Sequence, residues 1–241
     1  MRLHRIHTDQ DLEPDQAIRL AGDRAHYLGR VLRVTAAQRL VLFNGDGHDY
    51  AAEVLAVDRD AVRIAVCSRL PARRESPLAV TVVQAVSRGE RMDQTLQKCT
   101  ELGATGFRLL LSERVEVRLD GKRLAKRMDH WRSVIVAACE QSGRARVPEL
   151  AAPRRLDEWL TTPARSARLV LDPDAEHRLA DTPPAAALEL VVGPEGGFNA
   201  TELERMHAHG VDGVTLGPRI LRTETAAPAA IAVLQALHGD F

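Results

Sequence analysis

Two short apolar runs near the C-terminal end of the chain are each followed at once by a glycine-proline cluster. Leu188–Val192 leads into Gly-Pro-Glu-Gly-Gly at 193–197, and Val214–Leu216 leads into Gly-Pro-Arg-Ile-Leu at 217–221. Glycine lets the backbone turn sharply and approach a ligand closely, whereas proline fixes φ and removes a donor. If the two runs are parallel strands, both clusters lie at the sheet edge where α/β proteins bind ligands. The pattern favours a ligand site, with two tight turns and no ligand as the alternative.

The segment from residue 79 onward alternates short apolar runs with helical patterns, which is typical of an α/β domain with a mainly parallel sheet. Strands are predicted at 80–86, 107–111, 168–171, 188–192 and 214–216. Helices are predicted at 92–102, 122–141, 156–160, 199–209 and 225–237. Asn199 and Glu202 have the spacing of a capping box at the start of one helix. Pro228 is expected in the first turn of the last helix, where it is tolerated.

The first 70 residues have a β pattern. Strands are predicted at 39–43, 50–57 and 62–66, with the turn signal Asn-Gly-Asp-Gly after the first of them. A short helix capped by Asp23 should place Tyr27, Leu28, Val31 and Leu32 on one face. The polar, proline-bounded stretch 71–78 resembles a linker. We therefore expect two domains, a small β-barrel at 1–72 and an α/β domain at 73–241.

The charge of the chain is balanced overall but unevenly distributed. Its 33 basic residues include only three lysines, which reflects either codon usage or recognition of phosphate, for which arginine is well suited. Residues 73–155 carry a net charge of +7 and residues 156–241 one of −7. Such asymmetry is typical of nucleic-acid-binding proteins, although solvated helix faces would give the same count.

Several classes of protein are disfavoured. The three cysteines are too few and too scattered for a disulfide framework or a zinc site, and the nine histidines form no spaced metal set. The N-terminus lacks a secretory h-region, and no uncharged apolar run reaches the roughly 20 residues that span a bilayer. The signatures GxxxxGK[ST], GxGxxG and HExxH do not occur. We expect a cytoplasmic protein without a metal and without a membrane partner.

Motifs spread over nearly the whole chain resemble those of the ribosomal small-subunit RNA methyltransferase E family. They are GPEGGFNATE at 193–202, LGPRILRTETA at 216–226, ELG at 101–103, EQSGR at 140–144 and HYLGRVLRV at 26–34. The resemblance implies an α/β fold whose C-terminal SPOUT-type parallel-sheet domain holds a deep trefoil knot, preceded by a PUA-like β-barrel that binds RNA. It also implies a homodimer.

The activity that the resemblance implies is methyl transfer from S-adenosylmethionine to N3 of uridine 1498 in 16S rRNA of the 30S subunit. The cofactor would contact three loops of this chain: Leu171, Asp172 and Pro173; Gly193, Pro194, Glu195, Gly196 and Gly197; and Leu216, Gly217, Ile220 and Leu221, with Thr225 and Ala226 beyond them. Where the family carries a lysine-rich KGDK-like stretch, this chain has Arg-Gly-Glu-Arg at 88–91, which keeps the basic ends.

Arg222 follows the last cofactor loop directly and is the candidate donor to uracil oxygens that gain charge in the transition state. Glu224 is expected to orient Arg222 or to assist proton removal from N3, and the alternative is an ion pair that only fixes the loop. The candidate RNA-binding residues are Arg30, Arg33, Arg88, Arg91, Arg114 and Arg144. Tyr27 and Phe198 are the candidates for stacking on the target base.

Two further functions are compatible with the sequence: a SPOUT methyltransferase acting on tRNA, and a non-catalytic RNA-binding factor in ribosome assembly. The LGPRILRTETA motif and the N-terminal barrel motif favour the rRNA enzymes over the tRNA enzymes. Binding of S-adenosylmethionine distinguishes either enzyme from the non-catalytic factor.

Overall fold

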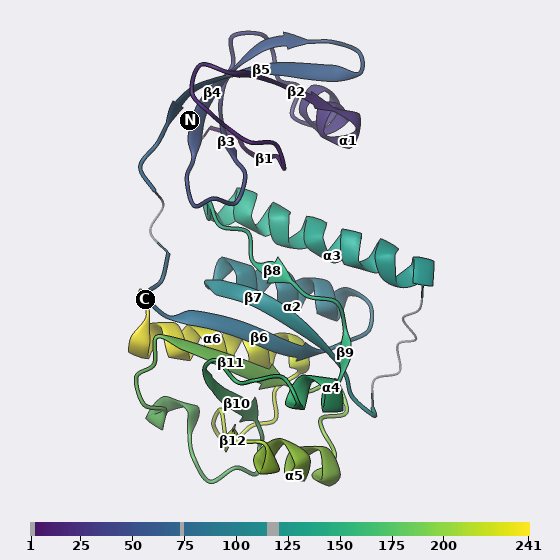
Figure 1. The fold of residues 1–241 in the computed structure, drawn as a ribbon, viewed down its shortest axis with the longest axis vertical. Coiled ribbons are helices and arrows are strands. Elements are labelled where there is room, and N and C mark those ends of the chain that lie inside the picture. The colour runs from purple at the N-terminus through teal and green to yellow at the C-terminus, as the bar shows by residue number, and fades with distance from the viewer. Residues whose placement is uncertain (1–2, 73–74, 115–120) are drawn as a thin grey trace. The chain divides into compact units, whose positions relative to one another are not determined.

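The computed structural model describes residues 3–72, 75–114 and 121–241 (Figure 1). The chain forms two compact units, one made of residues 1–74 with 139–147 and one made of residues 75–138 with 148–241. The segment 139–147 therefore groups with the first unit, although the sequence pattern assigned it to the second domain.

The first unit contains a five-stranded sheet in the order β1-β3-β4-β5-β2, in which only the β1–β3 pair is parallel. The elements of this unit before residue 75 are β1 (Arg5–His7), β2 (Ala17–Ala21), α1 (Gly22–His26), η1 (Tyr27–Val31), β3 (Arg39–Phe43), β4 (Tyr50–Val57) and β5 (Ala61–Arg69). The predicted strands at 39–43, 50–57 and 62–66 are confirmed as β3, β4 and part of β5. Alternate residues such as Leu40, Leu42 and Ile64 fill one core on which Leu28 packs.

Residues 139–147 are tied to the strands of this unit by polar contacts. The guanidinium of Arg5 donates to the carbonyl of Cys139 at 2.7 Å and to that of Arg144 at 3.2 Å, and it pairs with the buried Asp49 at 2.6 Å. The Glu140 carboxylate accepts from the His7 N–H and from Arg24, each at 2.9 Å. These contacts complete hydrogen bonds that buried polar groups require.

The second unit contains a sheet in the order β12-β10-β11-β6-β7-β8, with β9 also paired to β7, and every pair is parallel. Its strands are β6 (Ala79–Ala85), β7 (Ala104–Leu111), β8 (Glu149–Leu150), β9 (Arg154–Arg155), β10 (Ala167–Leu171), β11 (Ala187–Val192) and β12 (Val211–Val214). Its helices are α2 (Glu90–Glu101), α3 (Gly121–Ser142), α4 (Leu156–Leu160), η2 (Leu179–Asp181), α5 (Ala200–Ala208) and α6 (Thr223–His238), although residues 139–142 at the end of α3 group with the first unit. The α/β class predicted from the alternating pattern is confirmed.

The central strands are buried along almost their whole length, as expected for a parallel sheet covered by helices. Trp159 of α4 and Met206 of α5 share a core with Val83, Val170 and Val191, so these two helices cover one face. Helices α2 and α6 pack on one another, with α2 also against β7 and α6 also against β11. Asn199 caps α5 with the predicted capping box, accepting from the Glu202 N–H at 2.8 Å.

The helical segment near the N-terminus differs from its prediction. Asp23 lies in the first turn of α1 and makes no cap bond, because the helix already begins at Gly22. The following turn is a π-helix, whose wider winding changes which side chains share a face. Leu28 is fully buried as expected, but Val31 is 62% exposed.

Two predicted boundaries near the C-terminus were also wrong. β12 covers Val211–Val214 rather than 214–216, because pairing with β10 overrides the low strand propensity of Asp212 and Gly213. α6 begins at Thr223, so Pro228 lies within the helix rather than in its first turn. Pro228 lacks an N–H and cannot donate to the carbonyl of Glu224.

Candidate functional site

The carboxyl ends of β10, β11 and β12 surround a cavity of about 400 Å³ in the second unit. Three loops line it: the loop after β10, the Gly-Pro-Glu-Gly-Gly loop after β11, and the Leu-Gly-Pro-Arg-Ile-Leu loop after β12. Parallel strands end at a common edge, so segments distant in the sequence meet there. The volume lies in the range of small-molecule sites.

The structure brings together almost all residues that were predicted to contact a cofactor. The predicted residues on the cavity wall are Leu171, Asp172, Pro173, Gly193, Pro194, Glu195, Gly196, Gly197, Leu216, Gly217, Ile220, Leu221 and Ala226. Thr225 is exposed and does not line the cavity. Sequence reasoning missed the lining residues Asp174, Val192, Leu203, Thr215, Arg219 and Thr223, and it considered Phe198 only for stacking.

The loop after β12 offers backbone groups to the cavity. Gly217 has φ +78°, a left-handed conformation that favours glycine, and Ile220 is 86% exposed. Within the described parts of the chain, the N–H groups of Leu216, Ile220 and Leu221 donate to no other backbone group. Such groups could bind the polar edge of a heterocycle, and the leucine and isoleucine side chains that line the cavity could contact its faces.

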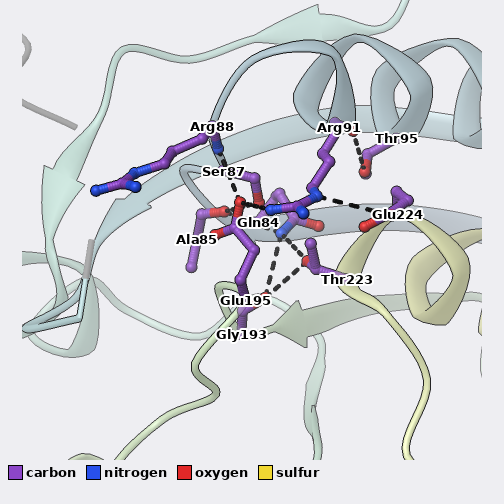
Figure 2. A network of polar contacts seen from close by, with 10 residues as sticks. All are labelled: Gln84, Ala85, Ser87, Arg88, Arg91, Thr95, Gly193, Glu195, Thr223 and Glu224. Atoms are coloured by element: carbon purple, nitrogen blue, oxygen red, sulfur yellow. Dashed lines mark hydrogen bonds and ion pairs between the residues drawn. The ribbon is translucent and has the colours of Figure 1, made fainter. Parts of the chain in front are cut away.

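A buried glutamine joins the loop after β11 to the start of α6 (Figure 2). The Gln84 side chain, at the end of β6, donates to Thr223 Oγ1 at 2.9 Å and to the Ala85 carbonyl at 2.9 Å. Thr223 Oγ1 in turn donates to the Gly193 carbonyl at 2.8 Å. Gln84 is fully buried, so these bonds fix the first helical residue of α6 against the cavity wall.

Arg91, in the first turn of α2, lies beside two carboxylates (Figure 2). Its guanidinium is 2.9 Å from Glu195 Oε1 and 3.8 Å from Glu224 Oε1. Glu195 also accepts the backbone N–H of Arg88 at 3.0 Å. Partial burial tends to raise the pKa of Glu195, but the bonds from Arg88 and Arg91 outweigh it and hold the pKa below its ordinary value. These contacts of Glu195 hold the loop after β11 against the start of α2.

Glu224 does not orient Arg222 as one of the two sequence hypotheses proposed. Its Oε1 faces Arg91, whereas its Oε2 is buried without a hydrogen-bond partner among the described residues. Arg222 is the N-cap residue of α6, and its side chain is exposed.

The comparisons with known proteins agree with this architecture. Residues 74–235 match the RNA methyltransferase domain family, and residues 20–67 match the RNA methyltransferase PUA domain family. A ribosomal RNA small subunit methyltransferase E from Buchnera aphidicola is 32% identical, over 99% of this chain and 98% of its own. The chain belongs to the ribosomal RNA small subunit methyltransferase E family. Its first unit is accordingly of the PUA type that the resemblance implied.

Two solved structures of similar proteins contain a cofactor. A methyltransferase E from Neisseria gonorrhoeae bound to S-adenosylmethionine is 36% identical, with a TM-score of 0.93 and full coverage of both chains. A methyltransferase from Legionella pneumophila in complex with the same cofactor is 39% identical, with a TM-score of 0.96 and full coverage of both chains. The cofactor expected from the sequence is therefore the one that these relatives bind.

In this member of the methyltransferase E family, the six arginines predicted to bind RNA have different surroundings. Arg30, Arg33 and Arg144 belong to the first unit, and the first two are exposed. In the second unit, the side chain of Arg114 donates to the Gly196 carbonyl, and Arg91 contacts the two carboxylates described above. Arg88 is exposed, and its backbone N–H donates to Glu195. Within the described residues, no group of three or more His, Cys, Asp or Glu could hold a metal, and no helix could cross a membrane.

Proposed function

We propose that this protein uses S-adenosylmethionine to methylate N3 of uridine 1498 in 16S rRNA of the small ribosomal subunit. The observation that carries the proposal is the cavity between the three loops, next to the Arg222–Glu224 segment, in a chain of the methyltransferase E family. The family relation supports an rRNA substrate, and the choice of uracil N3 rests on the motif resemblance.

The residues present fit the proposed cofactor. The cavity walls combine apolar side chains with N–H groups that have no backbone partner, which suits a molecule with a flat heterocycle and polar edges. A Cβ at Gly193 would lie 3.3 Å from both Gly197 Cα and the Phe198 ring, so the loop is packed without room for a side chain there. Leu171, Leu216 and Ala226 would contact the bound molecule.

For this reaction the protein must align the methyl group with uracil N3 and provide an acceptor for the N3 proton. Bound S-adenosylmethionine supplies an electrophilic methyl group on its sulfonium. The N3–H of uracil is only weakly acidic, so its proton needs an acceptor as the methyl group arrives. Glu224 is the proposed acceptor, because it stands between the cavity-lining residues Thr223 and Ala226 and its Oε2 has no partner among the described residues. Arg222, exposed at the start of α6, is the proposed donor to uracil O2 or O4.

The trefoil knot and the homodimer implied by the family resemblance belong to the same proposal. The segment after β12 leaves the sheet edge, yet Thr223 at its end is bonded to Gly193 and to Gln84 of the more central β6. A chain that runs from edge to centre past two other loops supports threading of that kind. Size-exclusion chromatography with light scattering tests the dimer.

The test of the function is a methylation assay with labelled S-adenosylmethionine and 30S subunits from a strain that lacks the gene. We expect incorporation at one uridine, read as a new stop in primer extension at position 1498. Glu224→Gln and Arg222→Ala should lower turnover while leaving cofactor affinity within a few fold. Equal losses of turnover and cofactor affinity would show that these two residues only support the loop.

Two controls separate the alternative functions. Methylation of purified tRNA, with none of 30S subunits, would identify a tRNA enzyme and refute the proposal. If titration calorimetry finds no binding of S-adenosylmethionine, the protein is an RNA-binding factor without this catalytic role.

A further inference from the structure

The first two turns of α3 carry four cationic side chains on the outer side of the helix. Lys122, Arg123 and Lys126 are exposed, and Arg127 is half-buried. At about 100° per residue, the four cover an arc of roughly 140°. The opposite side of α3 packs into the core through Trp131 and Ile135. We call these four residues the α3 basic face.

The charges of the α3 basic face are not neutralised within the described chain. None of the four side chains forms an ion pair or hydrogen bond with another described residue. The nearby Asp93 of α2 is already paired with His130 of α3 at 2.8 Å. Several other basic residues of the same unit do have carboxylate partners: Arg91, Lys98, Arg108, Arg168 and Arg178. Four neighbouring cations on one helix, without a partner among the described residues, are therefore a distinct feature of this unit.

The arrangement fits a polyanion whose charges repeat along a line. Lys122 and Lys126 lie one turn apart, as do Arg123 and Arg127. The face therefore presents two parallel rows, and the two cations of each row are about 6 Å apart along the helix axis. A membrane surface is a poorer fit, because the apolar side of α3 is buried in the core and cannot enter a bilayer. RNA phosphates match the charge and the repeat.

We propose that the α3 basic face binds backbone phosphates of the rRNA substrate. This inference rests on the proposed function for the identity of the RNA. It adds a contact surface that the six arginines predicted from the sequence do not include. The face contributes affinity and orientation rather than sequence recognition, since phosphate contacts carry no direct base information.

The test compares two variants of equal net charge. In the first, Lys122, Arg123, Lys126 and Arg127 are all replaced by Gln, which has a high helix propensity and should preserve α3. In the control, four exposed arginines elsewhere in the second unit, Arg154, Arg155, Arg165 and Arg178, are replaced by Gln. Binding of 16S rRNA and of 30S subunits is measured over a series of salt concentrations.

We expect the α3 variant to lose about three units from the slope of log K against log salt, since each phosphate contact contributes about 0.7–0.9. The control variant should keep the wild-type slope, and both should bind S-adenosylmethionine with wild-type affinity. An unchanged slope in the α3 variant, or an equal loss in the control, would overturn the inference. Failure of the wild type to methylate 30S subunits would instead refute the proposed function, because the slopes are measured without catalysis.

Discussion

The guanidinium of Arg91 lies 2.9 Å from the carboxylate of Glu195, which joins the start of α2 to the loop after β11. The same guanidinium lies 3.8 Å from Glu224, the proposed proton acceptor. Arg91, which was predicted to bind RNA phosphate, thus contacts two carboxylates of the site instead. We infer that Arg91 is a positioning residue that holds the cofactor loop and Glu224 in one arrangement.

Arg91→Ala should lower turnover on the order of 10–100-fold, because small displacements of a reacting group cost this much. The affinity for RNA and its salt dependence should stay at the wild-type level. Single-turnover assays and RNA titrations at several salt concentrations measure the two effects. A shallower salt slope, by about one phosphate contact, would instead assign Arg91 to RNA.

Arg91→Lys is the matched variant for this role. Lysine keeps the charge but cannot present a planar fork to two carboxylates, so partial recovery of turnover is expected. A double-mutant cycle with Glu195→Ala should give a coupling energy of about 0.5–1 kcal/mol, since both side chains are partly exposed. A coupling energy of zero would show that the Arg91–Glu195 ion pair does not stabilise the protein.

Glu195 should make stability depend on pH in the acid range. Its pKa in the folded protein lies below the ordinary value of 4.5, so folding favours the ionised form. The stabilisation is fully present above pH 4.5 and is lost as the pH falls through the folded-state pKa. The difference in unfolding free energy between wild type and Glu195→Gln, from urea titrations, should therefore shrink on acidification below 4.5. A difference that is the same at neutral and acid pH would contradict the assignment.

Thr223→Val should destabilise the second unit by about 1–3 kcal/mol, because the buried Gln84 amide and the Gly193 carbonyl each lose a partner. It should also weaken cofactor binding, since Thr223 lines the cavity. Thr225→Val, at an exposed position two residues on, is the control and should change stability by less than about 0.5 kcal/mol. Thermal unfolding and calorimetric titration measure the two effects. Equal behaviour of the two variants would remove the role assigned to the Thr223 hydroxyl.

Gly193→Ala should reduce affinity for S-adenosylmethionine more than tenfold. The added Cβ would press on Gly197 and on Phe198, and the loop would have to move. Gly29→Ala in the first unit is the control, because its Cβ would meet only Val57 at an ordinary 3.6 Å. Calorimetric titration of both variants checks the prediction, and unimpaired binding by Gly193→Ala would show that the loop tolerates a side chain.

The main elements of the second unit were predictable because local pattern and tertiary environment agree there. The run at 80–86 is rich in β-branched residues and almost wholly buried, and most of it forms β6. Asn199 and Glu202 formed the expected cap. The π-helix at Tyr27–Val31 was not predictable, because its residues have an ordinary helical pattern. β12 was misplaced since its pairing with β10, rather than its own residues, makes it a strand.

The loops that form the site could be predicted from the sequence, but the hydrogen bonds that join them could not. Glycine and proline mark the two loops in the sequence, and those loops do line one cavity. Nothing local indicates that Gln84, in the middle of an apolar run, bonds to Thr223, which lies 139 residues away along the chain. For the same reason Arg91 was assigned to phosphate, because its carboxylate partners become neighbours only in the folded sheet.

Because residues 139–147 belong to the first unit, this unit is encoded by two separate segments of the gene. A gene fragment that ends before residue 75 would encode all five strands, yet it would leave the His7 N–H and Arg24 without the carboxylate that they share. It would also remove the Cys139 and Arg144 carbonyls that receive the buried Arg5. Exchange of this unit between proteins by a single recombination junction is therefore disfavoured, and its sequence should change in concert with that of a distant nine-residue segment.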